Sequence, residues 1–203
     1  MDYLSRWDNL FNRIGCNKNP EEQFHRLVKA YSEKHRAYHN LNHIEQCLNE
    51  FDQLKYYLDL PDLVEIAIWY HDAIYNTRSD RNEEESALIA ENELNSLGII
   101  EEPIKTVHDL ILSTKHNDEP KNSDSKYLID IDLSILGANT NIFQEYEKNI
   151  RKEFKWVPKY LFQKKRGEVL KSFLRRKHIF YTELFRKKYE YQARININSV
   201  LSV

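Results

Sequence analysis

The chain has 203 residues, which is enough to bury a sizeable core, and we expect a single domain over residues 1–203. Four glycines and five prolines are few for an all-β protein, and the two cysteines, Cys16 and Cys47, provide no disulfide framework or thiolate zinc site. The net charge is −2, but residues 148–203 carry 16 Lys or Arg against four Glu, whereas the first 147 residues carry 14 basic and 28 acidic residues. No apolar run approaches the ~18 residues of a membrane helix, and the acidic N-terminal segment is unlike a secretory signal, so we expect a cytoplasmic protein with no membrane partner.

Helical periodicity begins clearly at the first predicted core helix. Asn42 and Glu45 fit a capping pair, which predicts a helix that begins at His43. A second helix is predicted at about 62–71; it is nearly all apolar and therefore expected to be buried. One face of the first helix is apolar at helical spacing, through Ile44, Cys47, Leu48, Phe51 and Leu54.

The next two helices have recognisable ends. Asp80 and Glu83 form a second candidate capping pair, and the helix they open is predicted to end at Gly98, which suits the position after a helix C-terminus. Pro103 can occupy the first turn of the following helix. The inward face of that helix is predicted to contain Ile104, Val107, Leu110, Ile111 and Thr114.

Helical patterns continue to the end of the chain. A helix at about 125–136 is predicted to end near Gly137, and three or four more follow Asn141, with a break near Pro158. At the usual length of about 11–12 residues per helix, this predicts an all-α protein of roughly eight to ten helices.

The end of the buried helix contains the first candidate metal ligands, His71 and Asp72. Adjacent side chains on a helix point about 100° apart, so the two cannot pack on each other, but both can reach one ion beyond the helix end. Neutral imidazole and carboxylate are ordinary ligands for Zn, Mn, Fe or Mg.

The helix at about 125–136 contains two aspartates on different faces. With Leu128 at 0° and about 100° per residue, Asp132 lies at about 40°, inside the apolar stripe, and Asp130 at about 200°, opposite it. A carboxylate that faces a core is costly unless it is paired or bound to a metal. We therefore predict Asp132 as a ligand in preference to a salt bridge with a buried arginine, and Asp130 as a solvated or supporting group.

Two histidines, His39 and His43, precede the His71-Asp72 pair and Asp132 in the sequence. His43, in the first turn of its helix, is the predicted further nitrogen ligand, whereas His39 shares its face only if the helix begins earlier. A lone histidine on a helix is more often a packed or capping side chain. Two histidines within five residues, ahead of a His-Asp pair and an inward aspartate, favour a metal site.

The order His43, His71-Asp72 and Asp132 resembles the H…HD…D order of the HD superfamily of metal-dependent phosphohydrolases. Longer segments are similar to a bacterial branch described as predicted metal-dependent HD phosphohydrolases: Arg36–Ile44, Ile68–Tyr75, Asp80–Ala87, Leu128–Gly137, Ile150–Phe154, Phe173–Arg176 and Glu190–Asn196. The resemblance covers about residues 36–197. It implies a helical HD-domain bundle, with a metal-site core at about 36–137 and C-terminal helices at about 140–200 packed on it.

The resemblance also implies one divalent metal ion. The sequence does not distinguish Mn, Mg, Zn, Fe, Co and Ni, and it leaves a second ion open. Secondary candidates fit an anion site: His39 near the substrate, Lys115 as a phosphate clamp, and His116 as a phosphate or second-metal contact. A basic last turn that complements the helix dipole explains Lys115 and His116 equally well. Glu84 is the candidate general acid or base, although an acidic first turn needs no catalytic explanation, and Arg151 is expected either to recognise phosphate or to form a structural ion pair.

The expected activity is hydrolysis of a phosphoester in a nucleotide or another small phosphorylated metabolite, with Asp72 orienting the attacking water or accepting its proton. Two alternatives stay open: a nucleotide-sensing HD module without turnover, and a nucleic-acid binder that uses the basic C-terminal third. Because the basic residues recur at helical spacing, solvated helix faces explain them better, and nucleic acid is not the expected partner. A homodimer stays open.

Overall fold

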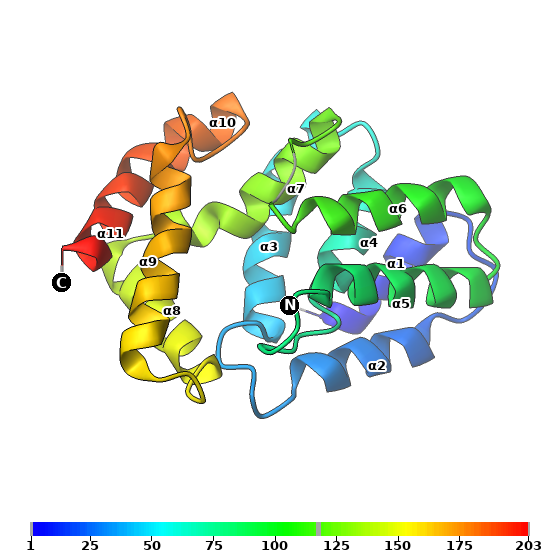
Figure 1. The fold of residues 1–203 in the computed structure, drawn as a ribbon. Coiled ribbons are helices and arrows are strands. Elements are labelled where there is room, and N and C mark those ends of the chain that lie inside the picture. Colours follow the sequence, from blue (N-terminus) through cyan, green and yellow to red (C-terminus); the bar gives the residue numbers. More distant parts are fainter. Residues whose placement is uncertain (1, 117–118, 203) are drawn as a thin grey trace. The chain divides into compact units, whose positions relative to one another are not determined.

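The computed structural model describes residues 2–116 and 119–202, and all the regular secondary structure within these ranges is helical (Figure 1). This confirms the predicted all-α class. The chain divides into two compact units, Met1–Leu128 and Ile129–Val203. The single domain expected over 1–203 stays a prediction, and we describe each unit by itself.

Helix α4 lies at the centre of the first unit, where every residue from Val64 to Tyr70 is buried, as the apolar sequence predicted. Helix α5 packs along α6, and α4 contacts both of them. The helices that begin in this unit are α1 Tyr3–Arg13, α2 Glu21–Tyr31, α3 Leu41–Leu54, η1 Lys55–Tyr57, α4 Pro61–Tyr70, α5 Asn82–Ser96, α6 Glu101–Ser113 and α7 Ser123–Leu133.

The predicted apolar face of α3 is buried throughout, but the predicted start of this helix is wrong. The helix begins at Leu41, because the side chain of Asn40 accepts a hydrogen bond from the backbone N–H of Asn42 at 2.9 Å. The spacing of Asn42 and Glu45 matches a capping box, yet the preceding asparagine occupies the cap. His43 is consequently the third helical residue and still belongs to the first turn.

The start of α5 also differs from the prediction. Arg81 precedes the helix and no side chain caps it, so the proposed Asp80–Glu83 pair is wrong. The Asn82 side chain instead binds the backbone N–H and carbonyl of Asn76 in the preceding loop, at 2.9 and 3.1 Å. The end of the helix is confirmed, because Gly98 follows the C-cap with a φ of +81°.

The second unit is built from η2 Ser134–Gly137, α8 Thr140–Glu153, α9 Lys159–Arg175, α10 Glu183–Phe185, the π-helical turn η3 Arg186–Glu190 and α11 Tyr191–Leu201. The predicted end near Gly137 is confirmed by η2, and the predicted break by Pro158, which precedes α9. A Cβ atom at Gly137 would lie 2.5 Å from the Cβ of Tyr189, so only glycine allows this close approach.

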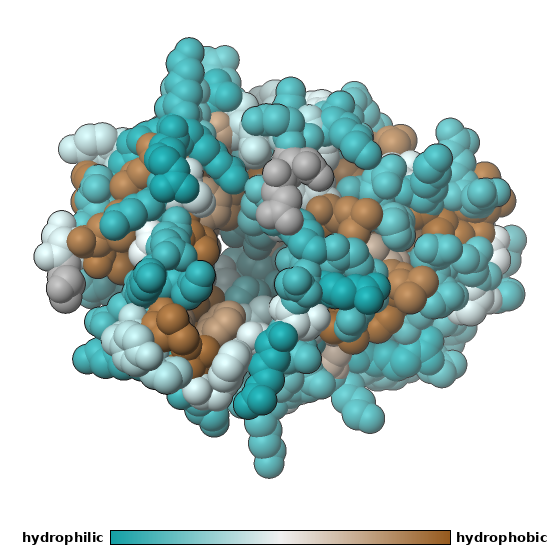
Figure 2. Space-filling view, viewed as in Figure 1, coloured by the Kyte–Doolittle hydropathy of each residue, from teal (hydrophilic) through white to brown (hydrophobic). Residues whose placement is uncertain are grey.

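Polar side chains, shown in teal, cover most of the face in Figure 2, and apolar residues form smaller patches between them. Across the described ranges, no helix combines the length and the apolar character that crossing a membrane requires.

Candidate metal centre

Two buried histidines from different helices of the first unit meet at their ring nitrogens. His43 comes from the first turn of α3, and His71 is the residue that ends α4. Their Nε2 atoms lie 3.1 Å apart. The predicted helix end at His71 therefore places its imidazole directly against that of His43.

The hydrogen bond on the other side of the His71 ring fixes its tautomer. The Nδ1 atom lies 2.9 Å from the carbonyl oxygen of Ile68, and a carbonyl can only accept. Nδ1 therefore carries a hydrogen, and in the neutral ring Nε2 presents a lone pair toward His43. The short approach of the two Nε2 atoms then requires either a proton on one of them or a bound cation between them.

Asp72 contributes a third donor atom to the same point. Its Oδ2 lies 3.2 Å from Nε2 of His71 and 3.5 Å from Nε2 of His43. Two atoms that bind one ion at about 2.1 Å, with bond angles near 90–109°, lie about 3.0–3.4 Å apart. Two imidazole nitrogens and a carboxylate oxygen at these spacings fit a divalent ion of the nitrogen- and oxygen-preferring kind.

The three histidines nearest Asp72 set its charge state. Burial opposes ionisation of the carboxyl, but the side chains of His71, His39 and His43 outweigh it and hold the pKa of Asp72 well below its usual value. Asp72 is thus a carboxylate at neutral pH. In this form it can act as a ligand or as a hydrogen-bond acceptor.

Arg36 holds the turn that contains Asp72. Its guanidinium is buried and donates to the carbonyl oxygens of Asp72 at 2.6 Å and Ala73 at 2.9 Å. It also lies over the rings of Tyr31 and Tyr75, at 5.3 and 5.6 Å from their centroids. The role of Arg36 could not be predicted from the sequence, because an arginine that binds backbone carbonyls leaves no periodic pattern.

His39 lies beside the cluster, in the segment that precedes the Asn40 cap. Its ring stacks on Tyr75 with a centroid distance of 4.1 Å and meets the ring of His43 edge-on at 5.8 Å. Of the two candidate histidines, His43 is therefore the one in direct contact with His71. The predicted substrate-side role of His39 is compatible with this position and stays a prediction.

The aspartates of α7 correct one sequence prediction. Asp130 is fully buried rather than solvated, and its carboxylate accepts hydrogen bonds from the N–H of Tyr181 at 2.8 Å and from the N–H and Oγ1 of Thr182, both at 2.7 Å. Burial raises the pKa of Asp130 to about 6 against the effect of these hydrogen bonds. The solvated position predicted for Asp130 is wrong, because a chain segment far along the sequence covers the face opposite the apolar stripe; the alternative of a supporting group stays a prediction. Asp132 is partly exposed and also belongs to the second unit.

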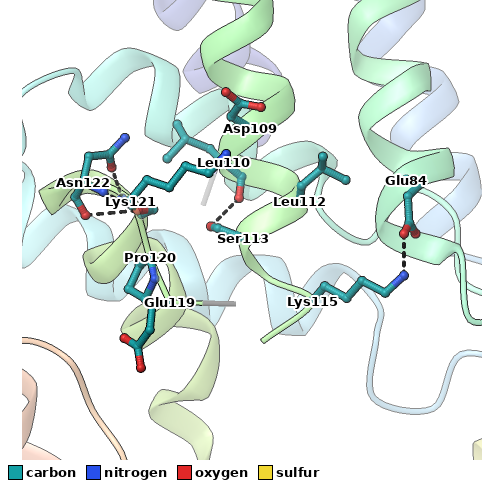
Figure 3. Close-up of a pocket in the computed structure, with 11 residues that line it drawn as sticks. Glu84, Asp109, Leu110, Leu112, Ser113, Lys115, Glu119, Pro120, Lys121 and Asn122 are labelled. Atoms are coloured by element: carbon teal, nitrogen blue, oxygen red, sulfur yellow. Dashed lines mark hydrogen bonds and ion pairs between the residues drawn. The ribbon is translucent and has the colours of Figure 1, made fainter. Parts of the chain in front are cut away.

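Glu84 and Lys115 form an ion pair at the edge of a pocket of about 370 Å³ in the first unit. In Figure 3 the pair lies across this pocket from Lys121 and Asn122. The hydrogen bond from Lys115 lowers the pKa of Glu84, and Lys115 also donates to the Asp80 carbonyl at 2.7 Å. A carboxyl with a lowered pKa is a weak proton donor at neutral pH, so this geometry does not favour Glu84 as the general acid.

The neighbouring carboxyl, Glu83, is electrostatically linked to the cluster. Burial raises its pKa, and the charge of Asp72 raises it further. Glu83 was predicted to belong to a helix cap, which the structure does not contain. Three consecutive glutamates, Glu83 to Glu85, begin α5, and the sequence alone does not show which of them is buried.

The remaining predicted substrate contacts lie at helix ends. His116 follows α6 with a φ of 59°, a left-handed conformation that is uncommon outside glycine. Arg151, in the second unit, donates to the carbonyl oxygens of Phe154 at 2.6 Å and Val157 at 2.9 Å. Its guanidinium therefore stabilises the turn between α8 and α9, which leaves the predicted phosphate contact without structural support.

Comparison of the chain with protein-family models, curated proteins and solved structures returns no match. The resemblance to the HD superfamily therefore stays a prediction from the sequence motifs.

Proposed function

We propose that this chain is a metal-dependent phosphohydrolase of the HD superfamily that cleaves a phosphoester in a nucleotide or another small phosphorylated metabolite. The observation that supports this most is the meeting of His43, His71 and Asp72, whose three donor atoms lie 3.1–3.5 Å apart. Buried imidazoles with one ring tautomer fixed by a backbone carbonyl are the ordinary form of a metal ligand.

The proposed ligand set is His43, His71, Asp72 and Asp132. Asp132 enters it from the motif order and from its position on α7. The start of that helix is held in the first unit, where the side chain of Asp124 accepts from the N–H groups of Asp59 and Leu60 at 2.9 and 2.8 Å.

A bound divalent ion would lower the pKa of a water molecule and polarise the phosphoryl oxygen. The residues of the chain supply the rest. Asp72, ionised and next to both imidazoles, is suited to orient the water. The pKa of Glu83 is raised by burial and by the charge of Asp72. Glu83 is therefore the carboxyl proposed to exchange a proton with the reacting groups, in place of Glu84.

The test begins with metal. Parent protein and His71→Ala are loaded with Mn, Zn, Fe, Co, Ni or Mg, and bound metal is measured together with phosphate release from a panel of nucleotides and phosphate esters. We expect His71→Ala to lose both, because a missing imidazole removes a ligand outright. The matched control is His25→Ala, since His25 is exposed and contacts Glu21 and the ring of Phe24 rather than the cluster.

Single-turnover assays with excess metal-loaded protein separate an enzyme from a sensor. Nucleotide binding without any phosphate release would replace the hydrolase with a sensing module. If His71→Ala stayed folded and kept full metal occupancy, the metal centre itself would be wrong.

The two neighbouring glutamates provide a second test. Glu83→Gln should lower turnover by about 100-fold or more with metal content unchanged, the scale of a lost acid or base. Glu84→Gln should have little effect. The opposite ranking would restore the role that the sequence predicted for Glu84.

A further inference from the structure

The turn between α8 and α9 exposes two large aromatic rings, each beside a lysine. The pairs are Lys155-Trp156 and Lys159-Tyr160, with 47% of Trp156 and 74% of Tyr160 exposed to solvent. The chain has three tryptophans, and the other two are completely buried. Rings of this size normally pack in the interior, so an exposed Trp-Tyr pair indicates a contact surface.

The backbone around Trp156 is held by Arg151. Arg151 donates to the carbonyl oxygens of Phe154 and Val157, one on each side of Trp156. The same guanidinium lies over the ring of Phe162, 4.9 Å from its centroid. These contacts fix the turn before any ligand binds, which reduces the entropy cost of presenting its side chains.

Helix α9 continues this surface as a line of cations. Tyr160, Lys164, Lys171 and Arg175 are spaced so that all four lie within about 60° of one line, over about 22 Å of the helix. The three cations are exposed and make no ion pair with other described residues. Glu168, the acid on this side of the helix, is neutralised by Lys165 at 3.3 Å.

We propose that this α9 surface, formed by Lys155, Trp156, Lys159, Tyr160, Lys164, Lys171 and Arg175, binds single-stranded nucleic acid. Its cations would contact successive phosphates, and unpaired bases would stack on the two rings. An exposed aromatic platform at one end of a cationic track is the combination that single strands require. The sequence favoured the interpretation that the basic residues of the C-terminal third lie on solvated helix faces. The α9 surface differs from such a face because its cations form one line that begins beside two exposed aromatic rings.

The arrangement does not suit an anionic membrane. A helix that lies in a bilayer interface needs apolar side chains along one face. On α9 the apolar residues Leu170 and Phe173 are buried, and the exposed Leu161 and Val169 lie about 80° apart with the exposed Lys165 between them, so the helix exposes no continuous apolar face. Duplex nucleic acid is disfavoured because its stacked bases leave no free face for the two rings.

The proposal is independent of the metal chemistry, because all of its residues belong to the second unit, and it is tested with metal-free protein in EDTA. A fluorescein-labelled 20-nucleotide oligo(dT) is titrated by anisotropy at several salt concentrations, and tryptophan emission is followed in parallel. Because Trp7 and Trp69 are buried, quenching reports Trp156. We expect quenching, and affinity that falls steeply with salt.

Variants separate stacking from charge. Trp156→Ala should abolish the quenching and weaken binding about 5- to 10-fold. Lys164→Glu with Lys171→Glu and Arg175→Glu should weaken binding by about 100-fold or more. The matched control reverses three exposed lysines of the first unit, Lys29, Lys34 and Lys105, with the same change of net charge.

An equal loss in the control triple variant would show that net charge alone drives binding, and would overturn the proposal. Tighter binding to a duplex, to dextran sulfate or to phosphatidylserine vesicles, without quenching by oligo(dT), would overturn it as well. Circular dichroism of each variant confirms that the fold is retained.

Discussion

Each of the two units contains an aspartate, and the chemical environments of these two aspartates differ. In the first unit, Asp72 faces the ring nitrogens of two buried histidines. In the second, Asp130 accepts three hydrogen bonds, from the backbone of Tyr181 and from the backbone and hydroxyl of Thr182. Neutral donors satisfy Asp130 completely, which makes it a structural clamp. Asp72 lies beside two imidazoles that can share a cation with it, which supports its proposed role as a ligand.

The units also differ in net charge. Residues 1–128 contain 24 acidic and 14 basic residues, whereas residues 129–203 contain 8 acidic and 16 basic residues. Three of the proposed metal ligands, His43, His71 and Asp72, belong to the acidic unit, and the proposed nucleic-acid surface belongs to the basic one. The near-neutral total conceals this division.

The largest expected difference concerns the two aspartates. Asp130→Ala should lower the free energy of unfolding by about 3 kcal/mol or more, because it leaves the donors of Tyr181 and Thr182 without their acceptor. Asp72→Ala in metal-free protein should lower it by less, about 1–2 kcal/mol, because the carboxylate interacts with the neighbouring histidines but accepts from no backbone N–H of the described residues. Urea denaturation in EDTA measures both.

Substitution of Asp72 should affect metal binding more than substitution of Asp130, the opposite of the order expected for stability. Asp72→Ala is expected to lose the ion, whereas Asp130→Asn, where folded, should keep nearly all of its affinity. Asp132→Asn is expected to behave like Asp72→Ala. If Asp130→Asn lost the ion and Asp132→Asn retained it, the two aspartates would exchange roles.

Two arginines offer a second, smaller comparison. Arg36 and Arg151 each donate to two or more backbone carbonyls and each lie over an aromatic ring, but only Arg36 holds the turn that contains a proposed ligand. Arg36→Leu should therefore weaken metal affinity by about 10- to 100-fold, the usual cost of losing support for a ligand.

Arg151→Leu should destabilise the protein without changing metal affinity. Isothermal titration with the preferred metal gives both affinities, and Arg36→Lys should recover part of the loss. Equal metal affinity in Arg36→Leu and parent protein would show that the His71-Asp72 turn keeps its position without the guanidinium.

Local pattern in the sequence predicted most of the helices and the residues at the centre of the site. The apolar faces of α3, α4 and α6 are buried as expected, and the end of α4 does place His71 against His43. What failed depended on contacts between distant segments. The burial of Asp130 requires Thr182, and the support of Asp72 requires Arg36; neither partner has a sequence signature.

The predicted starts of α3 and α5 were wrong for a different reason. Capping patterns are short, so Asn40 and Asn42 both match one, and only the backbone conformation decides between them. The consequence for the site was small, because His43 stays in the first turn whichever asparagine caps the helix.

The smallest expected effect concerns two ion pairs, one from each unit. Lys115–Glu84 lies at the rim of its pocket with 27% and 38% of the side chains exposed, whereas Arg166–Glu147 is more buried, at 13% and 15%, and Arg166 also donates to the hydroxyl of Tyr146 at 2.8 Å. Lys115→Met should leave the midpoint of urea unfolding almost unchanged, because exposed pairs contribute little. Arg166→Met should lower this midpoint clearly, because it leaves the carboxylate of Glu147 without a partner.

The same Lys115→Met protein tests the predicted phosphate clamp: with a substrate identified, an unchanged KM assigns Lys115 to the structure of the α5–α6 edge. A KM raised tenfold at constant kcat would instead show that Lys115 leaves Glu84 to bind the substrate phosphate, and that the first unit holds a ligand at both the cluster and this pocket.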